Sequence, residues 1–138
     1  MAIKSTMHVS DAMSYSAITG SKNDKVSDLA QIMRDKKIGA VVIVNEDDVP
    51  IGMVTEGDMV RKIVAEHRDP RNTTAADIMT TPVITITEDI SLDAAARLMA
   101  SNRIKKLCIV DLNGKLNGIL TEGDIVKHAV GLIGIFEQ

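Results

Sequence analysis

The hydrophobic positions of this chain follow two patterns, and each pattern occurs twice. The first places apolar residues three or four positions apart, which is the spacing of one face of an α-helix. This pattern occurs at Val26, Leu29, Ile32 and Met33 and again at Leu92, Ala95, Ala96 and Met99. We therefore expect two amphipathic helices, the first with a start that Asp24 can cap and the second with a start that Asp89 or Ser91 can cap.

The second pattern consists of short runs rich in Val and Ile, which favour strands. A short run precedes each helix and a longer run follows it, at residues 16–20, 38–55, 82–87 and 104–121. The two longer runs are interrupted by the polar turns NEDD and LNGK, and Asn113–Gly114 in the second turn is a strong hairpin signal. Each longer run therefore predicts two strands joined by a turn. Because the strands are nearly continuous in apolar residues, we expect helices to cover the sheet.

The whole order of elements repeats along the chain. Shifting the sequence by 66 positions places the tetrapeptide TEGD at residues 55–58 on a second TEGD at residues 121–124. Between residues 9 and 64 about 16 of the aligned pairs are identical, and no insertion is needed, which indicates an internal duplication. A further helix is expected after each TEGD, at residues 59–67 and 125–136. The repeated unit is therefore β-α-β-β-α.

The duplication also sets the expected domain boundaries. We expect a first copy at residues 8–68, a linker at 69–74 around Pro70, a second copy at 75–132, and a C-terminal tail at 133–138. One copy of this size buries too little apolar surface to be reliably stable alone. The expected architecture is a mixed α/β (α+β) fold in which the two copies pack sheet to sheet with pseudo-twofold symmetry.

Composition narrows the class of protein. The 138 residues are 45% hydrophobic and 25% charged with a net charge of −3, which is ordinary for a soluble globular protein. This mild acidity argues against nucleic acid as a partner, because phosphate backbones usually need a basic stripe. The N-terminal residues lack the apolar core of a signal peptide, and no run approaches the roughly 20 apolar residues of a membrane span. We therefore expect a cytoplasmic protein that does not cross a membrane.

The reactive side chains predict no catalytic site. Cys108 is the only cysteine, which excludes an intrachain disulfide, and its place in an apolar strand predicts a buried thiol. His8, His67 and His128 are scattered without metal-ligand spacing. Since no nucleophile–base arrangement is recognisable either, we expect a protein that is not an enzyme and has neither a required cofactor nor a bound metal.

The repeated TEGD has a simple structural interpretation. Thr followed three residues later by an acidic residue, just before an apolar helix, is typical of a capping box. Thr55 would bond the free N–H groups of the first helical turn, and Asp58 would interact with the positive end of the helix dipole.

The glycines around TEGD suggest a second role. Gly57 and Gly123 lie in the first helical turn, and Gly52 and Gly118 lie inside the preceding strands. Glycine is unfavourable in both places unless something approaches the backbone closely. A strand end that leads into a helix N-terminus offers N–H groups to an anion. Thr adds a hydroxyl donor, and Asp can accept from the two hydroxyls of a ribose. Together they suggest a nucleotide.

The sequence Gly-x-x-Thr-x-x-Asp at the end of each β-α-β-β-α copy resembles the CBS domain, named after cystathionine β-synthase. Two copies in tandem resemble the CBS pair, or Bateman module, and the likeness extends from Val9 to about Val130. The resemblance implies a regulatory module that binds adenine nucleotides (AMP, ADP or ATP) or related adenosyl compounds in two clefts between the copies.

The resemblance also implies which residues contact the ligand. Asp58 and Asp124 would hold the ribose, and Thr55 and Thr121 would contact phosphate, beside Gly57 and Gly123. Each cleft would mix the two copies. The second TEGD would face the group Ile18, Thr19, Ile38, Gly39 and Ala40. The first TEGD would face the group Pro82, Val83, Ile84, Ile104, Lys105 and Lys106.

The two clefts would differ in charge. Lys105 and Lys106 stand where the other copy has Gly39 and Ala40, so the cleft with Asp58 is predicted to prefer the more phosphorylated nucleotide unless both lysines point to solvent. Glu56 and Glu122 would either point outward or attract Mg²⁺.

Three further alternatives concern how the protein signals and which ligand it binds. As a stand-alone CBS pair, the protein would signal through an unknown protein effector or through a homodimer. The apolar segment at residues 129–136 is either a surface for that contact or the end of a final helix packed on its own core. The alternative function is an interaction scaffold whose clefts are empty or hold another adenosyl ligand such as S-adenosylmethionine.

Overall fold

The computed structural model describes residues 2–3 and 7–130, with the side chains of residues 7–128. The chain forms two compact units, one of residues Ala17–Val83 and one that joins residues Met1–Ser16 to Ile84–Gln138. In the described part of the chain, none of the helices has the length and apolar character needed to cross a membrane.

The unit of residues 17–83 contains a three-stranded sheet in the order β2-β3-β4. Its strands are β2 (Thr19–Gly20), β3 (Ala40–Val44) and β4 (Pro50–Thr55). Strand β2 pairs with β3 in parallel, and β3 pairs with β4 as an antiparallel hairpin. Its helices are α1 (Val26–Lys36), α2 (Glu56–Met59), the π-helical η2 (Val60–Val64) and α3 (Ala75–Ile78).

The other unit repeats this sheet in the order β5-β6-β7. Its strands are β5 (Thr85–Ile86), β6 (Lys106–Val110) and β7 (Leu116–Thr121), and they pair as their counterparts do. Its helices are the 3₁₀ helix η1 (Val9–Asp11), α4 (Leu92–Asn102) and α5 (Glu122–His128). Strands β1 (Ala2–Ile3) and β8 (Ala129–Val130) form a short antiparallel pair. The predicted mixed α+β fold with two matching sheets is confirmed.

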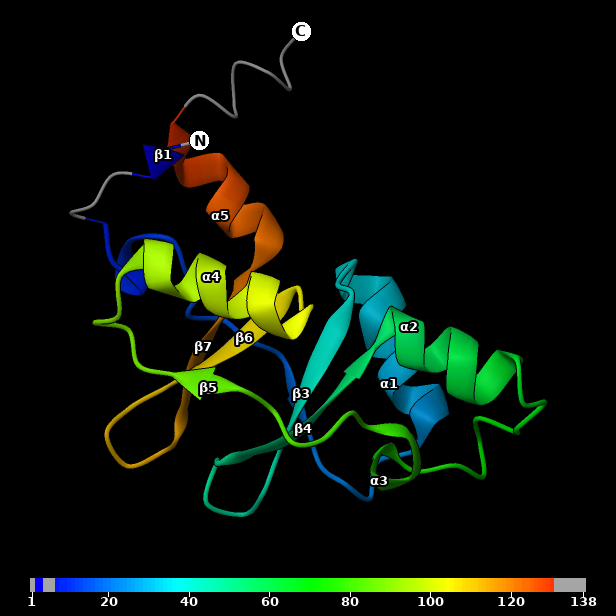
Figure 1. The fold of residues 1–138 in the computed structure, drawn as a ribbon. Helices are drawn as coiled ribbons and strands as arrows, with labels where there is room; N and C mark the ends of the chain where they lie inside the picture. Colours follow the sequence, from blue (N-terminus) through cyan, green and yellow to red (C-terminus); the bar gives the residue numbers. More distant parts are fainter. Residues whose placement is uncertain (1, 4–6, 131–138) are drawn as a thin grey trace, which may run out of the picture. The chain divides into compact units, whose positions relative to one another are not determined.

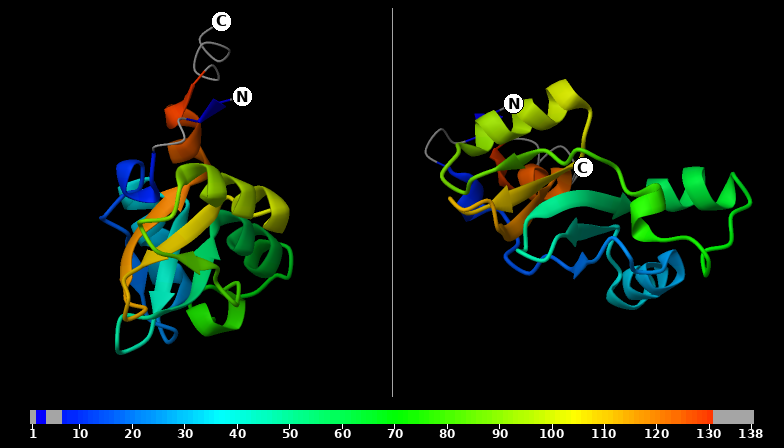
Figure 2. Two further views of the ribbon diagram at one scale, coloured as in Figure 1. Left: turned by 60° about the vertical axis from the view of Figure 1, so that its left-hand side comes forward. Right: turned by 90° about the horizontal axis from the view of Figure 1, so that it is seen from below.

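Each unit has its own hydrophobic core between its long helix and one face of its sheet. The first core contains Val26, Leu29, Met33, Val41, Ile43, Val54, Ile63, Ala75 and Ile78. The second core contains Val9, Met13, Leu92, Ala95, Met99, Leu107, Ile109, Leu120 and Ile125. Figures 1 and 2 show α1 lying along β3 and β4, and α4 lying along β5, β6 and β7. The helical spacing seen in the sequence therefore marks the faces that contact the sheets.

The compact units do not coincide with the repeated sequence segments. Val9 belongs to the core of the second copy, and its backbone N–H donates to the carbonyl of Ile90 over 2.8 Å. In the same way, Ala75 and Ile78 belong to the core of the first copy. Figure 1 shows the blue N-terminal segment beside the start of α4. The segment that begins each copy in the sequence thus completes the core of the other copy.

The two long helices start differently although their sequences align. The expectation for Ser91 is confirmed, because its Oγ accepts the backbone N–H of Ala94 at 3.1 Å. The expectation for Asp24 is wrong: the N-cap is Lys25, whose side chain makes no capping bond, and Asp24 accepts the N–H of Ser21 at 2.9 Å instead. Asp89 bonds the hydroxyl of Thr87 rather than the helix.

Some elements differ from the predicted lengths. Strands β2 and β5 have two residues each, because only these residues pair with the neighbouring strand. The helix expected at residues 125–136 ends at His128, and residues 129–130 pair with β1 instead. The remainder of that segment and the expected tail at 133–138 lie outside the described residues.

Candidate ligand-binding site

Both TEGD segments lie at the junction between a strand and a helix, as the capping-box interpretation predicts. In the first copy, Thr55 Oγ1 accepts the N–H of Asp58 at 3.2 Å, and Asp58 Oδ2 accepts the N–H of Thr55 at 2.9 Å. In the second copy, Thr121 and Asp124 make the same two bonds at 3.2 and 2.9 Å. Capping is therefore confirmed as one role of both tetrapeptides.

Each TEGD lies beside the start of the first strand of the hairpin in its own copy, which is β3 in the first copy and β6 in the second. Thr55 is paired with Ala40, and Thr121 is paired with Lys106. Directly opposed residues of an antiparallel pair have their side chains on the same face. The backbone N–H of Glu122 also donates to the carbonyl of Lys105 over 2.8 Å. Lys106 is thus the cationic residue next to the threonine hydroxyl of the second copy, where the first copy has an alanine.

The close approach predicted at the strand glycines is confirmed, and the approaching group is the protein itself. A methyl group on Gly118 would overlap the carbonyl oxygen of Ser14, whose N–H and C=O both bond Ile119. A methyl group on Gly52 would lie 2.5 Å from Met79 Sδ. These glycines therefore make room for the segment that enters from the other copy, and they carry no information about a ligand.

The carboxylate of Asp58 is buried and fully engaged. Its side chain is 1% exposed, and Oδ1 accepts from Lys62 Nζ at 2.9 Å and from Thr80 Oγ1 at 3.0 Å. Oδ2 accepts from the N–H of Thr55 and from its hydroxyl at 3.1 Å. Burial raises the pKa of Asp58, but the hydrogen bonds from Lys62, Thr55 and Thr80 and the charge of Lys62 outweigh it and hold the pKa below its usual value.

The carboxylate of Asp124 is in a more open environment. It is half-buried, and in the described part of the chain its only donor is the N–H of Thr121, which bonds Oδ2. His128 occupies the position of Lys62, but its Nδ1 lies 2.8 Å from the backbone oxygen of Asp124 and not from the carboxylate. Asp124 therefore keeps acceptor capacity that Asp58 has already used.

The helix N-termini at the two TEGD segments also differ in accessibility. A methyl group on Gly57 would lie 2.7 Å from Arg61 Nη2, so a guanidinium covers this glycine. Among the described residues, a methyl group on Gly123 would meet only Thr121 Oγ1 at 3.7 Å, and Gly123 is exposed. Glu56 and Glu122 are both exposed, and Glu56 lies over Gly39. The second copy thus presents the more accessible helix start.

The remaining residues expected at the site divide between the two units. Residues Ile18, Thr19, Ile38, Gly39, Ala40, Pro82 and Val83 belong to the unit of residues 17–83. Residues Ile84, Ile104, Lys105 and Lys106 belong to the other unit. Inside its own unit, the carbonyl of Ile18 accepts the N–H of Val42, as that of Ile84 accepts the N–H of Cys108. The grouping of residues from both copies around one ligand stays a prediction.

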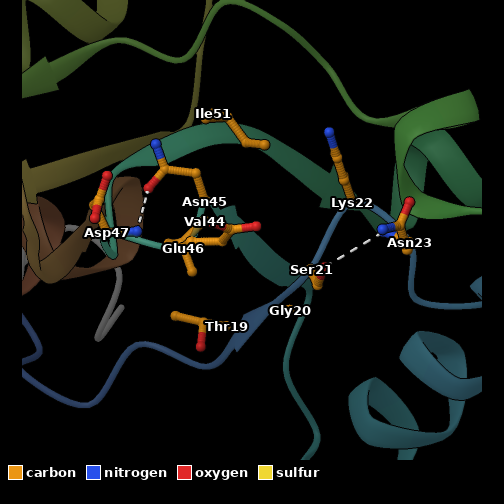
Figure 3. A pocket seen from close by; sticks show the side chains of 10 residues that line it. All are labelled: Thr19, Gly20, Ser21, Lys22, Asn23, Val44, Asn45, Glu46, Asp47 and Ile51. Atoms are coloured by element: carbon orange, nitrogen blue, oxygen red, sulfur yellow. Dashed lines mark hydrogen bonds between the residues drawn. The ribbon is translucent and has the colours of Figure 1, made fainter.

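A separate hollow of 470 Å³ lies in the unit of residues 17–83, at the other end of β3 from Thr55. Figure 3 shows its lining of Thr19, Gly20, Ser21, Lys22, Asn23, Val44, Asn45, Glu46, Asp47 and Ile51. Of the residues predicted to bind a ligand, only Thr19 contributes. In the other unit, the counterparts of Lys22 and Ile51 are Glu88 and Asn117, which are joined by a 2.7 Å hydrogen bond.

The expected buried cysteine is confirmed. Cys108 is 0% exposed, and burial raises the pKa of its thiol to about 11. Among the residues with described placement, three or more His, Cys, Asp or Glu side chains nowhere gather as a metal site would require.

Two residues at the first TEGD were missed in the sequence. Lys62 lies four positions after Asp58, which is the spacing of an ion pair on one helix face, so the sequence did contain a signal for it. Thr80 lies 22 positions away, and only the tertiary structure brings it to Asp58.

Comparison with known proteins identifies the repeated unit. The CBS domain model matches residues 9–65 and 75–131. The chain belongs to the CBS domain family. The predicted resemblance is thereby confirmed, and the protein contains a CBS domain pair, which is a regulatory ligand-binding module.

Relatives of this CBS pair include proteins that match nearly the whole chain. An uncharacterized protein of Methanopyrus kandleri is 42% identical over 133 residues, which are 96% of this chain and 68% of that protein. A solved putative signal-transduction protein from Burkholderia ambifaria has 34% identity and a TM-score of 0.78, over 91% of this chain and 92% of its own. A CBS pair solved with 5′-methylthioadenosine and S-adenosyl-L-methionine has 30% identity and a TM-score of 0.79, over 88% and 98%.

Proposed function

We propose that this CBS pair binds an adenosyl ligand, with the carboxylate of Asp124 accepting the ribose hydroxyls. The observation that carries the proposal is the uncommitted acceptor capacity of Asp124 at the start of α5. A carboxylate has about four lone-pair positions, and the described contacts of Asp124 use one of them. The ribose of an adenosyl compound presents two neighbouring hydroxyl donors, which a carboxylate can accept together.

The groups around Asp124 suit a phosphate on the same ligand. The hydroxyl of Thr121 accepts the N–H of Asp124, and within the described residues its own hydrogen has no acceptor, so it can donate to a ligand. Although the sequence predicts Lys106 in the cleft with Asp58, it stands opposite Thr121 on the neighbouring strand, so we place its positive charge beside Asp124 instead. These features support AMP, ADP or ATP as the regulatory ligand, and binding would leave the chemistry of the ligand unchanged.

A second ligand is supported by a specific relative. The CBS pair solved with 5′-methylthioadenosine and S-adenosyl-L-methionine contains compounds that share the adenosine moiety but lack phosphate. If Lys105 and Lys106 point to solvent, the recognition of adenosine would remain and the preference for phosphate would disappear. Replacing the two lysines therefore distinguishes the two classes of ligand, the phosphorylated nucleotides and the adenosyl compounds that lack phosphate.

Isothermal titration calorimetry with AMP, ADP, ATP, S-adenosylmethionine and 5′-methylthioadenosine tests the proposal. We expect binding that Asp124→Asn weakens at least about tenfold, because a hydrogen bond to a charged group contributes about 1.5–3 kcal/mol. Asp93→Asn is the control, since Asp93 forms only an exposed ion pair with Arg97 on α4. The double substitution Lys105→Ala/Lys106→Ala is expected to weaken the binding of ATP but not the binding of adenosine. A folded protein that binds none of these compounds contradicts the proposal.

We further propose that the bound ligand changes self-association or the affinity for a protein effector, with a homodimer as the basic assembly. The same titrations followed by light scattering report whether ligand changes the assembly. A scaffold with empty sites would give an unchanged mass and no heat of binding.

A further inference from the structure

The two TEGD segments have the same sequence but different amounts of free hydrogen-bonding capacity. Four donors contact the carboxylate of Asp58: Lys62 Nζ, Thr80 Oγ1, and the N–H and hydroxyl of Thr55, at 2.9–3.1 Å. These donors match the roughly four lone-pair positions of a carboxylate. The hydroxyl hydrogen of Thr55 is also used, so neither group at this TEGD is left for a ribose or a phosphate.

The residues responsible for this difference stand at matching positions of the two copies. Lys62 is matched by His128, and Thr80 is matched by Ser14. The ring of His128 contacts the backbone oxygen of Asp124, and the hydroxyl of Ser14 accepts the N–H of Ser16 at 3.3 Å. In the described residues, neither of them donates to Asp124. Two of the four donors to Asp58 therefore come from side chains that differ between the copies, and they occupy Oδ1, whereas Thr55 of TEGD occupies Oδ2.

The contacts of Asp58 also have a structural purpose. Lys62 Nζ donates to the carbonyl of Ile78 over 2.8 Å as well as to Asp58, and Thr80 joins the same carboxylate. The backbone of Thr80 pairs with Met53 on β4 by two hydrogen bonds of 2.8 and 3.1 Å. Asp58 and Lys62 thus hold the segment that follows α3 against the end of the β3–β4 hairpin.

We infer that the duplicated TEGD has divided into a structural half and a ligand-binding half, so that each chain binds one adenosyl ligand, through Asp124, and Lys62 and Thr80 together close the site at Asp58. This inference rests on the proposed function for the identity of the ligand. It departs from the symmetric expectation of two occupied clefts.

Binding stoichiometry tests the inference on the full chain. Equilibrium dialysis and calorimetry with ATP and S-adenosylmethionine are expected to show one ligand per chain. Asp124→Asn is expected to weaken binding at least tenfold, and Asp58→Asn to change it less than twofold. Two ligands per chain, or one that Asp58→Asn removes, overturn the inference while the proposed function stands. Binding of no ligand overturns both.

Lys62→His gives the first copy the residue that the second copy has. In this variant combined with Thr80→Ala we expect a second binding event, because both donors to Asp58 Oδ1 are removed and two positions become available to the two ribose hydroxyls. A folded Lys62→His/Thr80→Ala protein that still binds one ligand shows that these two side chains do not close the site and overturns that part of the inference. Stability provides a reading that does not need a ligand: Asp58→Asn is expected to lower the melting temperature clearly, and Asp124→Asn only slightly. Equal shifts would contradict the division into two roles.

Discussion

At the scale of single residues, residues of the same type in this protein have very different surroundings. A methyl group on Gly118 would overlap the backbone of Ser14, whereas among the described residues one on Gly123 would make only an ordinary contact with Thr121. A carbonyl oxygen that is itself hydrogen-bonded cannot move aside cheaply, so the cost of a side chain at Gly118 is set by the neighbouring segment. At Gly123 only the backbone preference of glycine matters.

We therefore expect Gly118→Ala to destabilise the protein by about 2–3 kcal/mol, which is typical of overpacking against a rigid partner. Gly123→Ala is the matched control and is expected to be neutral or to stabilise by up to about 1 kcal/mol, because alanine is the better helix former. Chemical denaturation with urea measures both changes. Equal stability of the two variants would show that the Ser14 segment moves away freely.

At the scale of elements, corresponding helices use different means to begin at corresponding positions. Helix α4 has a side-chain cap from Ser91, whereas α1 begins at Lys25 without one. Both end in the left-handed conformation, at Lys37 with φ of 54° and at Arg103 with the same φ. Since both helices bury a similar apolar face, burial sets their length, and the cap adds local stability to one of them.

Removing the cap should therefore affect only one helix. Ser91→Ala is expected to destabilise the protein by about 1 kcal/mol, because the N–H of Ala94 loses its acceptor. Lys25→Ala at the matching position is the control and is expected to change the free energy of unfolding by less than about 0.5 kcal/mol. Thermal unfolding followed by circular dichroism compares them. A larger loss in the control would mean that Lys25 supports α1 in some other way.

At the scale of the whole molecule, each compact unit is built from sequence segments of both copies. Val9 is 0% exposed in the core of the second copy, and Ile78 is 1% exposed in the core of the first. These segments therefore link the stability of each sheet to residues that lie far away in the sequence.

This exchange of segments predicts where the effect of a core substitution appears. Val9→Ala is expected to cost about 2 kcal/mol and to reduce amide protection in β6 and β7, although Val9 lies in the first copy. Ile78→Ala is the matched variant and is expected to reduce protection in β3 and β4. Native-state hydrogen exchange measures both patterns. Loss of protection in β3 and β4 from Val9→Ala would contradict the assignment of Val9 to the second core.

The sequence alone predicted the repeated β-α-β-β-α order and the family, because these follow from local periodicity and from the repeat itself. It did not predict the short helices η1 and α3 or the end of α5 at His128. The helical spacing at Val26 and Leu92 identified the faces that are buried, and the TEGD spacing identified both capping boxes. Each of these features depends on residues within a few positions of one another, so their physical effect can be estimated without knowledge of the rest of the chain.

Only the tertiary structure decided how the contacts of the two TEGD segments differ. The partners of Asp58 include Thr80, which is 22 positions away, and the neighbour of Gly118 is Ser14, which is more than a hundred residues away. Such contacts depend on how the chain crosses between its copies, and a repeated motif contains no information about that path. Whether a carboxylate accepts from its own protein or remains available to a ligand is therefore set by distant residues, although the carboxylate itself can be found in the sequence.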